Sequence, residues 1–187
     1  MEKYTSEQAL EKLKSGNKAY VESGVNNGKV SADIRLKTYN VGQAPYAIIV
    51  GCSDSRVIPE TIFSAVIGDL FVIRVAGNVI DDHQLGSIEY AAEHLGSKLV
   101  VVLGHDHCGA VDAAMNHDPD GHIKYITDEI LKAIGDEKDE VMACCMNVQH
   151  SVQMIEENVD IQNLESHNGL KVMGAIYHLD SGIVDFL

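Results

Sequence analysis

Four short, nearly continuous apolar runs constrain the fold of this chain more than any other feature. Runs of this length without polar alternation are typical of strands buried on both faces of a parallel sheet. Helical patterns lie between them, and such strand–helix alternation indicates an α/β fold with right-handed crossovers. The four runs are Tyr46–Gly51, Leu70–Val75, Leu99–Leu103 and Val172–Tyr177.

The segments around these runs complete the predicted architecture. An amphipathic helix over 5–22, with Ser6 as its N-cap, and a second helix over 30–40 precede the first run. Gly182–Leu187 follows a turn signal, so we expect a hairpin that adds an antiparallel fifth strand. The other predicted helices cover 59–66, 82–95, 109–117 and a long stretch from 123 to 165. The prediction is one α/β domain, residues 1–187, with helices flanking four parallel strands and one C-terminal antiparallel strand.

The charge balance excludes several classes of partner. The chain has 14 Lys and Arg residues against 28 Asp and Glu residues, so its formal net charge is −14. Such a protein is repelled by phosphate backbones and by anionic membrane surfaces, so we expect neither nucleic-acid nor membrane binding. The first residues lack the apolar core of a secretory signal, so we expect a cytoplasmic location. In that compartment, cysteines are more often metal ligands, catalytic thiols or core residues than disulfides.

Chemically reactive side chains follow two of the predicted strands. The first apolar run leads into the sequence GCSDSR and the third into GHDHCG. Ligands of open α/β sheets bind beyond the carboxyl ends of the strands, so Cys52, His105 and Cys108 are expected to meet there. Two thiolates and an imidazole form a ligand set suited to Zn²⁺. Three protein ligands leave a fourth position open, which is the pattern of a catalytic zinc site.

Two charged residues follow Cys52 closely, and they allow two arrangements of the predicted site. Arg56 can pair with Asp54, because a guanidinium and a carboxylate form a two-pronged hydrogen bond. Asp54 could instead be the fourth zinc ligand in a closed state, or it could accept a hydrogen bond from a zinc-bound water. The sequence leaves both arrangements open.

Together, GCSDSRVIPE, GDLFVIRVAGN and LGSIEYAAEHLGSKLVVVLGHDHCGAV strongly resemble the β-class carbonic anhydrases, over about residues 5–187. The resemblance implies a lyase with one Zn²⁺ per chain that interconverts CO₂ with bicarbonate and a proton. A zinc-bound hydroxide would attack CO₂, oriented by Asp54 and Arg56 as the family's Asp–Arg dyad. The resemblance further implies a homodimer or homotetramer, with an N-terminal helical arm, residues 1–42, packed on the partner subunit.

The resemblance also assigns a substrate site. Gln43 matches a glutamine that, in plant-type members, reaches a neighbouring active site across the dimer and donates to a substrate oxygen. Phe71, Ala76 and Tyr90 fall where that branch lines its apolar CO₂ pocket, although Ala76 replaces a larger aliphatic residue. Asp106 stands where the family often has a small hydroxyl residue. An acidic residue beside a zinc ligand is expected to raise the working pH.

Several alternatives remain open at this stage. The same zinc site could hydrolyse CS₂ or COS, or the chain could be a zinc-binding module without turnover. Cys144 and Cys145 could form a redox pair, but their position within a helix favours core packing. His107 could be an additional ligand, but a loop position exposed to solvent is the simpler interpretation. His107 and His83 are the candidates for a proton shuttle.

Overall fold

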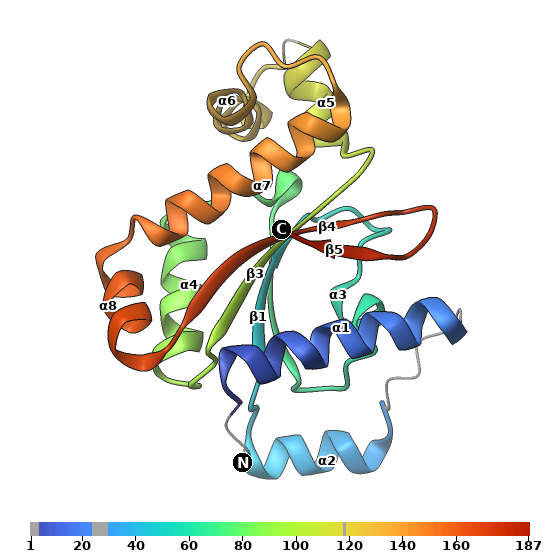
Figure 1. The fold of residues 1–187 in the computed structure, drawn as a ribbon, viewed down its shortest axis with the longest axis vertical. Coiled ribbons are helices and arrows are strands. Elements are labelled where there is room, and N and C mark those ends of the chain that lie inside the picture. The colour runs from blue at the N-terminus through green and yellow to red at the C-terminus, as the bar shows by residue number, and fades with distance from the viewer. Residues whose placement is uncertain (1–3, 24–29, 118) are drawn as a thin grey trace.

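A five-stranded sheet forms the centre of the molecule, in a computed structural model that describes residues 4–23, 30–117 and 119–187 (Figure 1). The strands lie in the order β2-β1-β3-β4-β5, parallel except for the antiparallel pair β4 and β5. The predicted fold of four parallel strands and one C-terminal antiparallel strand is therefore confirmed. The strands are β1 (Ala47–Gly51), β2 (Leu70–Arg74), β3 (Leu99–His105), β4 (Lys171–Tyr177) and β5 (Val184–Phe186).

The helices occupy the predicted segments, with corrections to their number and ends. The stretch 123–165 is three helices, because Gly135 ends the first with a φ of 53° and the side chains of Asp139 and Asn158 cap the next two. The predicted helix 59–66 is a single turn. The helices are α1 (Ser6–Ser23), α2 (Ala32–Val41), α3 (Pro59–Ile62), α4 (Asp82–Glu93), α5 (Gly109–Asn116), α6 (Ile123–Ile134), α7 (Glu140–Glu156) and α8 (Val159–Asn168), with a 3₁₀ turn, η1 (Ala76–Asn78).

The N-cap predicted for α1 is off by one residue. The hydroxyl oxygen of Thr5 accepts a hydrogen bond from the backbone N–H of Gln8, and the Gln8 side chain accepts one from the N–H of Thr5. This reciprocal pair is a capping box, which satisfies two donors at the helix start. Ser6 is buried instead.

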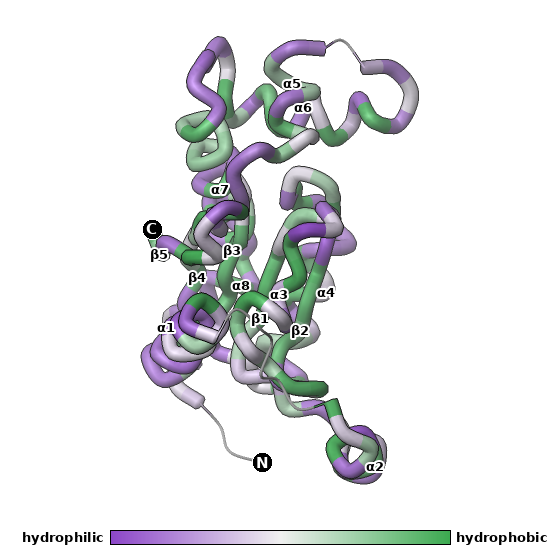
Figure 2. The backbone as a smooth tube through the Cα atoms, turned by 90° about the vertical axis from the view of Figure 1, so that its right-hand side faces the viewer, coloured by the Kyte–Doolittle hydropathy of each residue, from purple (hydrophilic) through white to green (hydrophobic). Residues whose placement is uncertain are grey.

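Alternate side chains of the central strands point to opposite faces of the sheet, and each face has its own helical cover. Both layers are apolar, as the green strand segments of Figure 2 show. Each fully buried aliphatic side chain stabilises the fold by about 1.5–3 kcal/mol. One face packs on α1 and α3 through Ile49, Val101, Leu103, Leu13 and Phe63. The other packs on α4, α7 and α8 through Ile48, Val50, Val102, Ile88, Val148, Ile155 and Ile161.

Helix α1 is tightly docked on the sheet of its own chain. Gly16 allows this approach, because a Cβ at that position would lie 2.0 Å from the backbone oxygen of Phe63. The buried side chain of Asn17 donates to the carbonyl oxygens of Ile62 and Gly182 and accepts a hydrogen bond from the N–H of Val184. These contacts fix α1 to α3 and to the C-terminal hairpin.

Helix α2 differs from α1, since it buries none of its residues. It stands apart from the strands, beyond their amino ends (Figures 1 and 2). Leu36, Tyr39 and Val41 expose their apolar side chains on it. Residues 1–3 and 24–29 of the predicted arm lie outside the described residues, and the packing of this arm on a partner subunit stays a prediction. None of the described helices is long and apolar enough to cross a membrane.

Candidate metal centre

The three predicted ligands meet at the carboxyl ends of two neighbouring strands. Cys52 follows the last residue of β1, His105 ends β3, and Cys108 is the N-cap of α5. Strands β1 and β3 pair in register, with Gly51 beside Leu103, so the two chain segments leave the sheet side by side. The ligand atoms of Cys52, His105 and Cys108 all lie within 4.8 Å of one another, and all three residues are buried. The convergence predicted from the sequence is present.

The imidazole of His105 is oriented for a metal. Its Nδ1 lies 2.7 Å from the carbonyl oxygen of Asp106, a contact in which Nδ1 carries the proton and Nε2 keeps its lone pair. Nε2 is buried, and within the described residues it has no hydrogen-bond partner. A buried polar atom without a partner destabilises a fold, and a bound cation would supply the missing partner. The residues present therefore fit a zinc ion.

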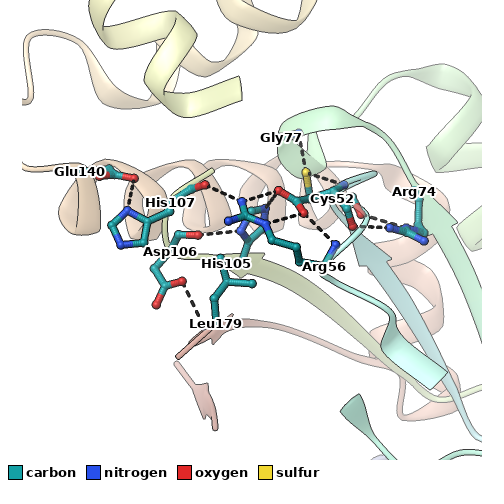
Figure 3. A network of polar contacts seen from close by, with 10 residues as sticks. Cys52, Arg56, Arg74, Gly77, His105, Asp106, His107, Glu140 and Leu179 are labelled. Atoms are coloured by element: carbon teal, nitrogen blue, oxygen red, sulfur yellow. Dashed lines mark hydrogen bonds and ion pairs between the residues drawn. The ribbon is translucent and has the colours of Figure 1, made fainter. Parts of the chain in front are cut away.

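The Cys52 sulfur lies among hydrogen-bond donors. The backbone N–H groups of Asp54 and Gly77 point at it, at 3.4 and 3.3 Å (Figure 3). Gly77 has a φ of 66°, and a Cβ there would lie 2.8 Å from Ile130, so this position requires glycine. The pKa of the Cys52 thiol is lowered to about 4, chiefly because the Cys108 thiol donates a hydrogen bond to its sulfur.

The same contact has the opposite effect on Cys108. The neighbouring Cys52 sulfur and burial both raise the pKa of the Cys108 thiol. Two thiolates this close repel each other, and a divalent cation between them would reverse that balance. The pair of Cys52 and Cys108 is therefore suited to bind a soft cation.

Asp54 and Arg56 form the predicted ion pair beside the ligands. Arg56 donates from Nε to Oδ1 of Asp54 at 3.0 Å, from Nη2 to Oδ2 at 2.7 Å and from its backbone N–H to Oδ1 at 2.9 Å. The guanidinium therefore holds the pKa of the Asp54 carboxyl well below its usual range. Oδ2 of Asp54 lies 4.0 Å from Nε2 of His105. The Asp54 carboxylate is thus paired with the Arg56 guanidinium.

The His105–Cys108 loop is joined to this pair through its backbone. Nη2 of Arg56 also donates to the carbonyl oxygen of His107 at 3.1 Å, and His107 adopts a left-handed φ of 49°. The His107 imidazole points away from the ligands toward Glu140, at 3.3 Å (Figure 3). His107 is an exposed loop residue, as predicted. His83, the other shuttle candidate, is exposed at the start of α4.

Asp106 turns its carboxylate toward the C-terminal hairpin. It accepts a hydrogen bond from the backbone N–H of Leu179 at 3.1 Å and lies 3.3 Å from Nδ1 of His178. His178 also contacts Asp185, at 3.0 Å. The sequence did not indicate this contact, which ties the loop of the metal ligands to the turn between β4 and β5.

The predicted substrate residues are not gathered around the ligands of the same chain. Gln43 is exposed before β1, at the opposite end of that strand from Cys52. Phe71 pairs with Ile48 in the sheet, in the amino half of β2, and its ring centroid lies 6.2 Å from that of Tyr90. Of these four residues, Ala76 directly precedes Gly77, whose N–H faces the Cys52 sulfur.

Two residues that hold the backbone around Cys52 were not predicted from the sequence. Arg74, the last residue of β2, binds the loop that carries Cys52 and Asp54. Asn147 of α7 is buried and donates to the carbonyl oxygen of Gly77 at 2.7 Å, which fixes the turn whose N–H faces Cys52. Strand-end position was the signal available for Arg74, whereas Asn147 lies far away in the chain.

Cys144 and Cys145 are not ligands of this centre. Cys144 is buried beneath it, among residues of α5, α6 and α7, and burial raises the pKa of its thiol to about 12. Burial also raises the pKa of Cys145. Thiols that stay protonated are poor nucleophiles, so the expected role of Cys144 in core packing is confirmed.

Comparison with known proteins decides the family. The family model described as carbonic anhydrase matches residues 47–184. The chain belongs to the β-class carbonic anhydrases. A carbonic anhydrase of Mycolicibacterium smegmatis is 34% identical over 189 residues, covering 95% of this chain and 91% of the relative. Carbonic anhydrase 2 of Mycobacterium tuberculosis is 47% identical over 124 residues, or 65% of this chain, and the match spans only 59% of that relative's length.

Solved β-carbonic anhydrases share the fold. CafA of Aspergillus fumigatus superposes with a TM-score of 0.76 at 29% identity, covering 96% of this chain and 88% of that one. A β-carbonic anhydrase of Sordaria macrospora, described as tetrameric, gives a TM-score of 0.75 at 28% identity and covers 92% of this chain and 93% of that one. The predicted family and fold class are confirmed.

Proposed function

We propose that this protein is a zinc enzyme that catalyses the reversible hydration of CO₂ to bicarbonate and a proton. The observation that carries the proposal is the buried Cys52–His105–Cys108 cluster with the Asp54–Arg56 pair beside it. Membership of the carbonic anhydrase family supports the same reaction. All five residues are present, which argues against a zinc-binding module without turnover.

The ligands and the ion pair have separate tasks in this proposal. Zinc held by Cys52, His105 and Cys108 would lower the pKa of a water molecule, from 15.7 toward about 7 in favourable sites, and so supply the nucleophile. Asp54 stays ionised because Arg56 lowers its pKa, and its oxygens keep lone pairs that accept a hydrogen bond from the attacking water. That bond would fix the direction of attack on CO₂.

We assign Gln43, Phe71, Ala76 and Tyr90 to the substrate side. CO₂ is apolar and would lie against the phenyl, methyl and phenol groups, while the Gln43 amide donates to the oxygen that gains negative charge. Gln43 and Phe71 lie toward the amino half of the sheet in their own chain, and Tyr90 of α4 contacts Phe71. We therefore propose that they serve the metal centre of a neighbouring subunit.

The proposed assembly is a homodimer or a homotetramer, in which α2 of the N-terminal arm packs on the partner. The exposed apolar side chains of α2 support this assignment, as does the tetrameric state named for the Sordaria relatives. A cytoplasmic location is part of the same proposal. Four free cysteines, of which two are needed as thiolates, support a reducing compartment.

Stopped-flow CO₂ hydration on protein of measured zinc content tests the function. We expect turnover that requires about one zinc per chain and rises toward alkaline pH, because two thiolates leave the cation less positive than neutral ligands would. Parallel assays with COS and CS₂ test the alternative substrates. Zinc-loaded protein that turns over COS or CS₂ but not CO₂ would overturn the proposed reaction.

A further inference from the structure

Arg74 holds the backbone of the loop that carries the first metal ligand. Its Nε donates to the carbonyl oxygen of Cys52 at 2.9 Å, and its Nη2 donates to the carbonyl oxygen of Asp54 at 2.6 Å (Figure 3). One guanidinium therefore spans two carbonyl groups that lie two residues apart. Neither oxygen belongs to the ligand set or to the carboxylate of the ion pair.

Asp54 is thereby held from two directions. Arg56 binds the carboxylate and sets the direction of the side chain. Arg74 binds the main chain of the same residue, where the carbonyl oxygen also accepts a hydrogen bond from the N–H of Val57. The two arginines come from different elements, because Arg56 follows Asp54 in the loop and Arg74 ends the neighbouring strand β2.

The place of Arg74 in the sheet explains how it reaches this loop. Arg74 pairs in register with Gly51, the last residue of β1, so its side chain starts beside the point where the loop begins. Backbone hydrogen bonds continue past both strand ends, from Val75 to Gly51 and from Ser53 to Val75. The loop thus continues the β1–β2 pairing. The Arg74 guanidinium adds side-chain hydrogen bonds to the backbone of this loop.

We infer that Arg74 is a positioning residue of the metal centre: its bidentate contact with the carbonyl oxygens of Cys52 and Asp54 fixes the distance between the Cys52 ligand and the Asp54 carboxylate. The inference rests on the proposed metal binding. A planar guanidinium presents donors in a fixed fork, which a lysine ammonium cannot reproduce. Residues that hold ligands in place typically change metal affinity or activity about 10- to 100-fold when they are replaced.

Two variants distinguish the effect of the planar donor geometry of Arg74, its fork, from the effect of its positive charge. Arg74→Gln removes both, whereas Arg74→Lys keeps the positive charge but loses the fork. We expect both variants to fold, since Arg74 is exposed, and both to release metal to a chelator at least about tenfold faster than the unchanged protein. Lys18→Gln is the control for loss of one surface charge, because Lys18 is exposed on α1 and outside the metal centre.

Cobalt substitution provides a readout that a purely structural role would not change. The ligand-field and thiolate charge-transfer bands of Co²⁺ report the geometry of the ligands, and we expect both Arg74 variants to shift these bands. With zinc bound, kcat should fall while KM changes little, since Arg74 holds Asp54 rather than substrate. A change in thermal stability alone, with unchanged cobalt spectra and unchanged metal release, would overturn the inference.

The results for Arg74→Lys and for the unchanged protein also test the inference. Full recovery in Arg74→Lys, with loss only in Arg74→Gln, would show that charge rather than the fork matters, and it would overturn the positioning role. If Arg74→Gln does not fold, the comparison of Arg74→Lys with the unchanged protein still tests the fork. Failure of the unchanged protein to bind Co²⁺ or Zn²⁺ would refute the proposed function itself, which is a different result from failure of the Arg74 variants.

Discussion

The two ends of the sheet differ in how much of a site one chain completes. At the carboxyl ends of β1 and β3, the ligands are buried and the residues of the ion pair beside them are hydrogen-bonded to each other within the chain. At the amino ends, Gln43 is exposed and α2 buries none of its residues. All three candidate metal ligands therefore come from a single chain. In our proposal, binding and turnover of CO₂ also need a second chain.

This contrast predicts two kinds of variant. Changes at the carboxyl end should alter metal content or turnover without changing the oligomeric state. Changes at the amino end should alter assembly or substrate handling and leave the metal in place.

Cys52→Ser should abolish both metal binding and CO₂ hydration. An alkoxide is far harder to form than a thiolate, and serine oxygen is a poor partner for a soft cation site. Metal analysis and stopped-flow assays measure the two losses. Cys145→Ser is the matched control, because Cys145 is a half-buried thiol outside the ligand set, and it should keep both properties.

Asp54→Asn should keep the metal but lower kcat about 10³-fold, within the range of general acid–base and orienting groups. The lowered pKa of Asp54 means that its carboxylate is ionised at every pH at which the enzyme works. The shape of the pH–rate profile should therefore be the same in the variant, with only its height reduced. A profile that loses its alkaline rise in Asp54→Asn would contradict this assignment.

Gln43→Ala should lower kcat/KM by about 10²-fold, the usual cost of losing one donor to a developing oxyanion. Zinc content should be unchanged, because Gln43 lies at the other end of β1 from the ligands. A mixture of Gln43→Ala chains with Cys52→Ser chains provides the sharper test. If Gln43 acts across subunits, mixed dimers contain one site with both residues intact, and activity should reappear on mixing.

Tyr39→Ala should weaken self-association about tenfold or more, because aromatic residues at interface centres carry much of the binding energy. Sedimentation velocity over a dilution series measures the change. Tyr125→Ala on α6 is the control, since Tyr125 is 77% exposed and Tyr39 is 85% exposed. If the two variants self-associate equally strongly, α2 does not contribute to the interface.

Glu7→Gln should lower the melting temperature by less than about 3 °C, because exposed ion pairs contribute little. Glu7 of α1 binds Lys171 at the start of β4, and this hydrogen bond lowers its pKa to about 2. A lowered pKa stabilises the fold above the ordinary pKa near 4.5, and this contribution is lost as the pH falls toward 2. The difference between the two proteins should thus be present at pH 6 and vanish in acid.

The parts predicted well from the sequence depend on local patterns. Apolar runs located the four parallel strands, and a turn signal located the C-terminal strand. The buried faces of β1 and β3 explain why their runs are nearly continuous. The ligands were predictable because Cys52, His105 and Cys108 lie at the carboxyl ends of such strands or within three residues of them. The Asp54–Arg56 pair was predictable because both residues lie within one short loop.

The parts that were missed depend on local helix caps or on a contact between distant segments. The break of 123–165 into three helices is set by the caps Asp139 and Asn158, which interrupt a pattern that stays helical on both sides. Arg74 acts on a loop that precedes it by 20 residues, through strand register. The N-cap of α1 is Thr5, one residue before the predicted Ser6, because Thr5 and Gln8 form the reciprocal hydrogen bonds of a capping box.

The ligand positions have a consequence for folding. Cys52 and Cys108 belong to segments separated by β2, α4 and β3, so an ion bound to both would cross-link the chain across a large closed loop. Closing such a loop removes conformations from the unfolded chain, and the binding free energy adds to that of folding. A metal bound there would therefore stabilise the fold as well as take part in the proposed reaction. Chains that leave the ribosome in a metal-starved cell would be the ones exposed to proteases.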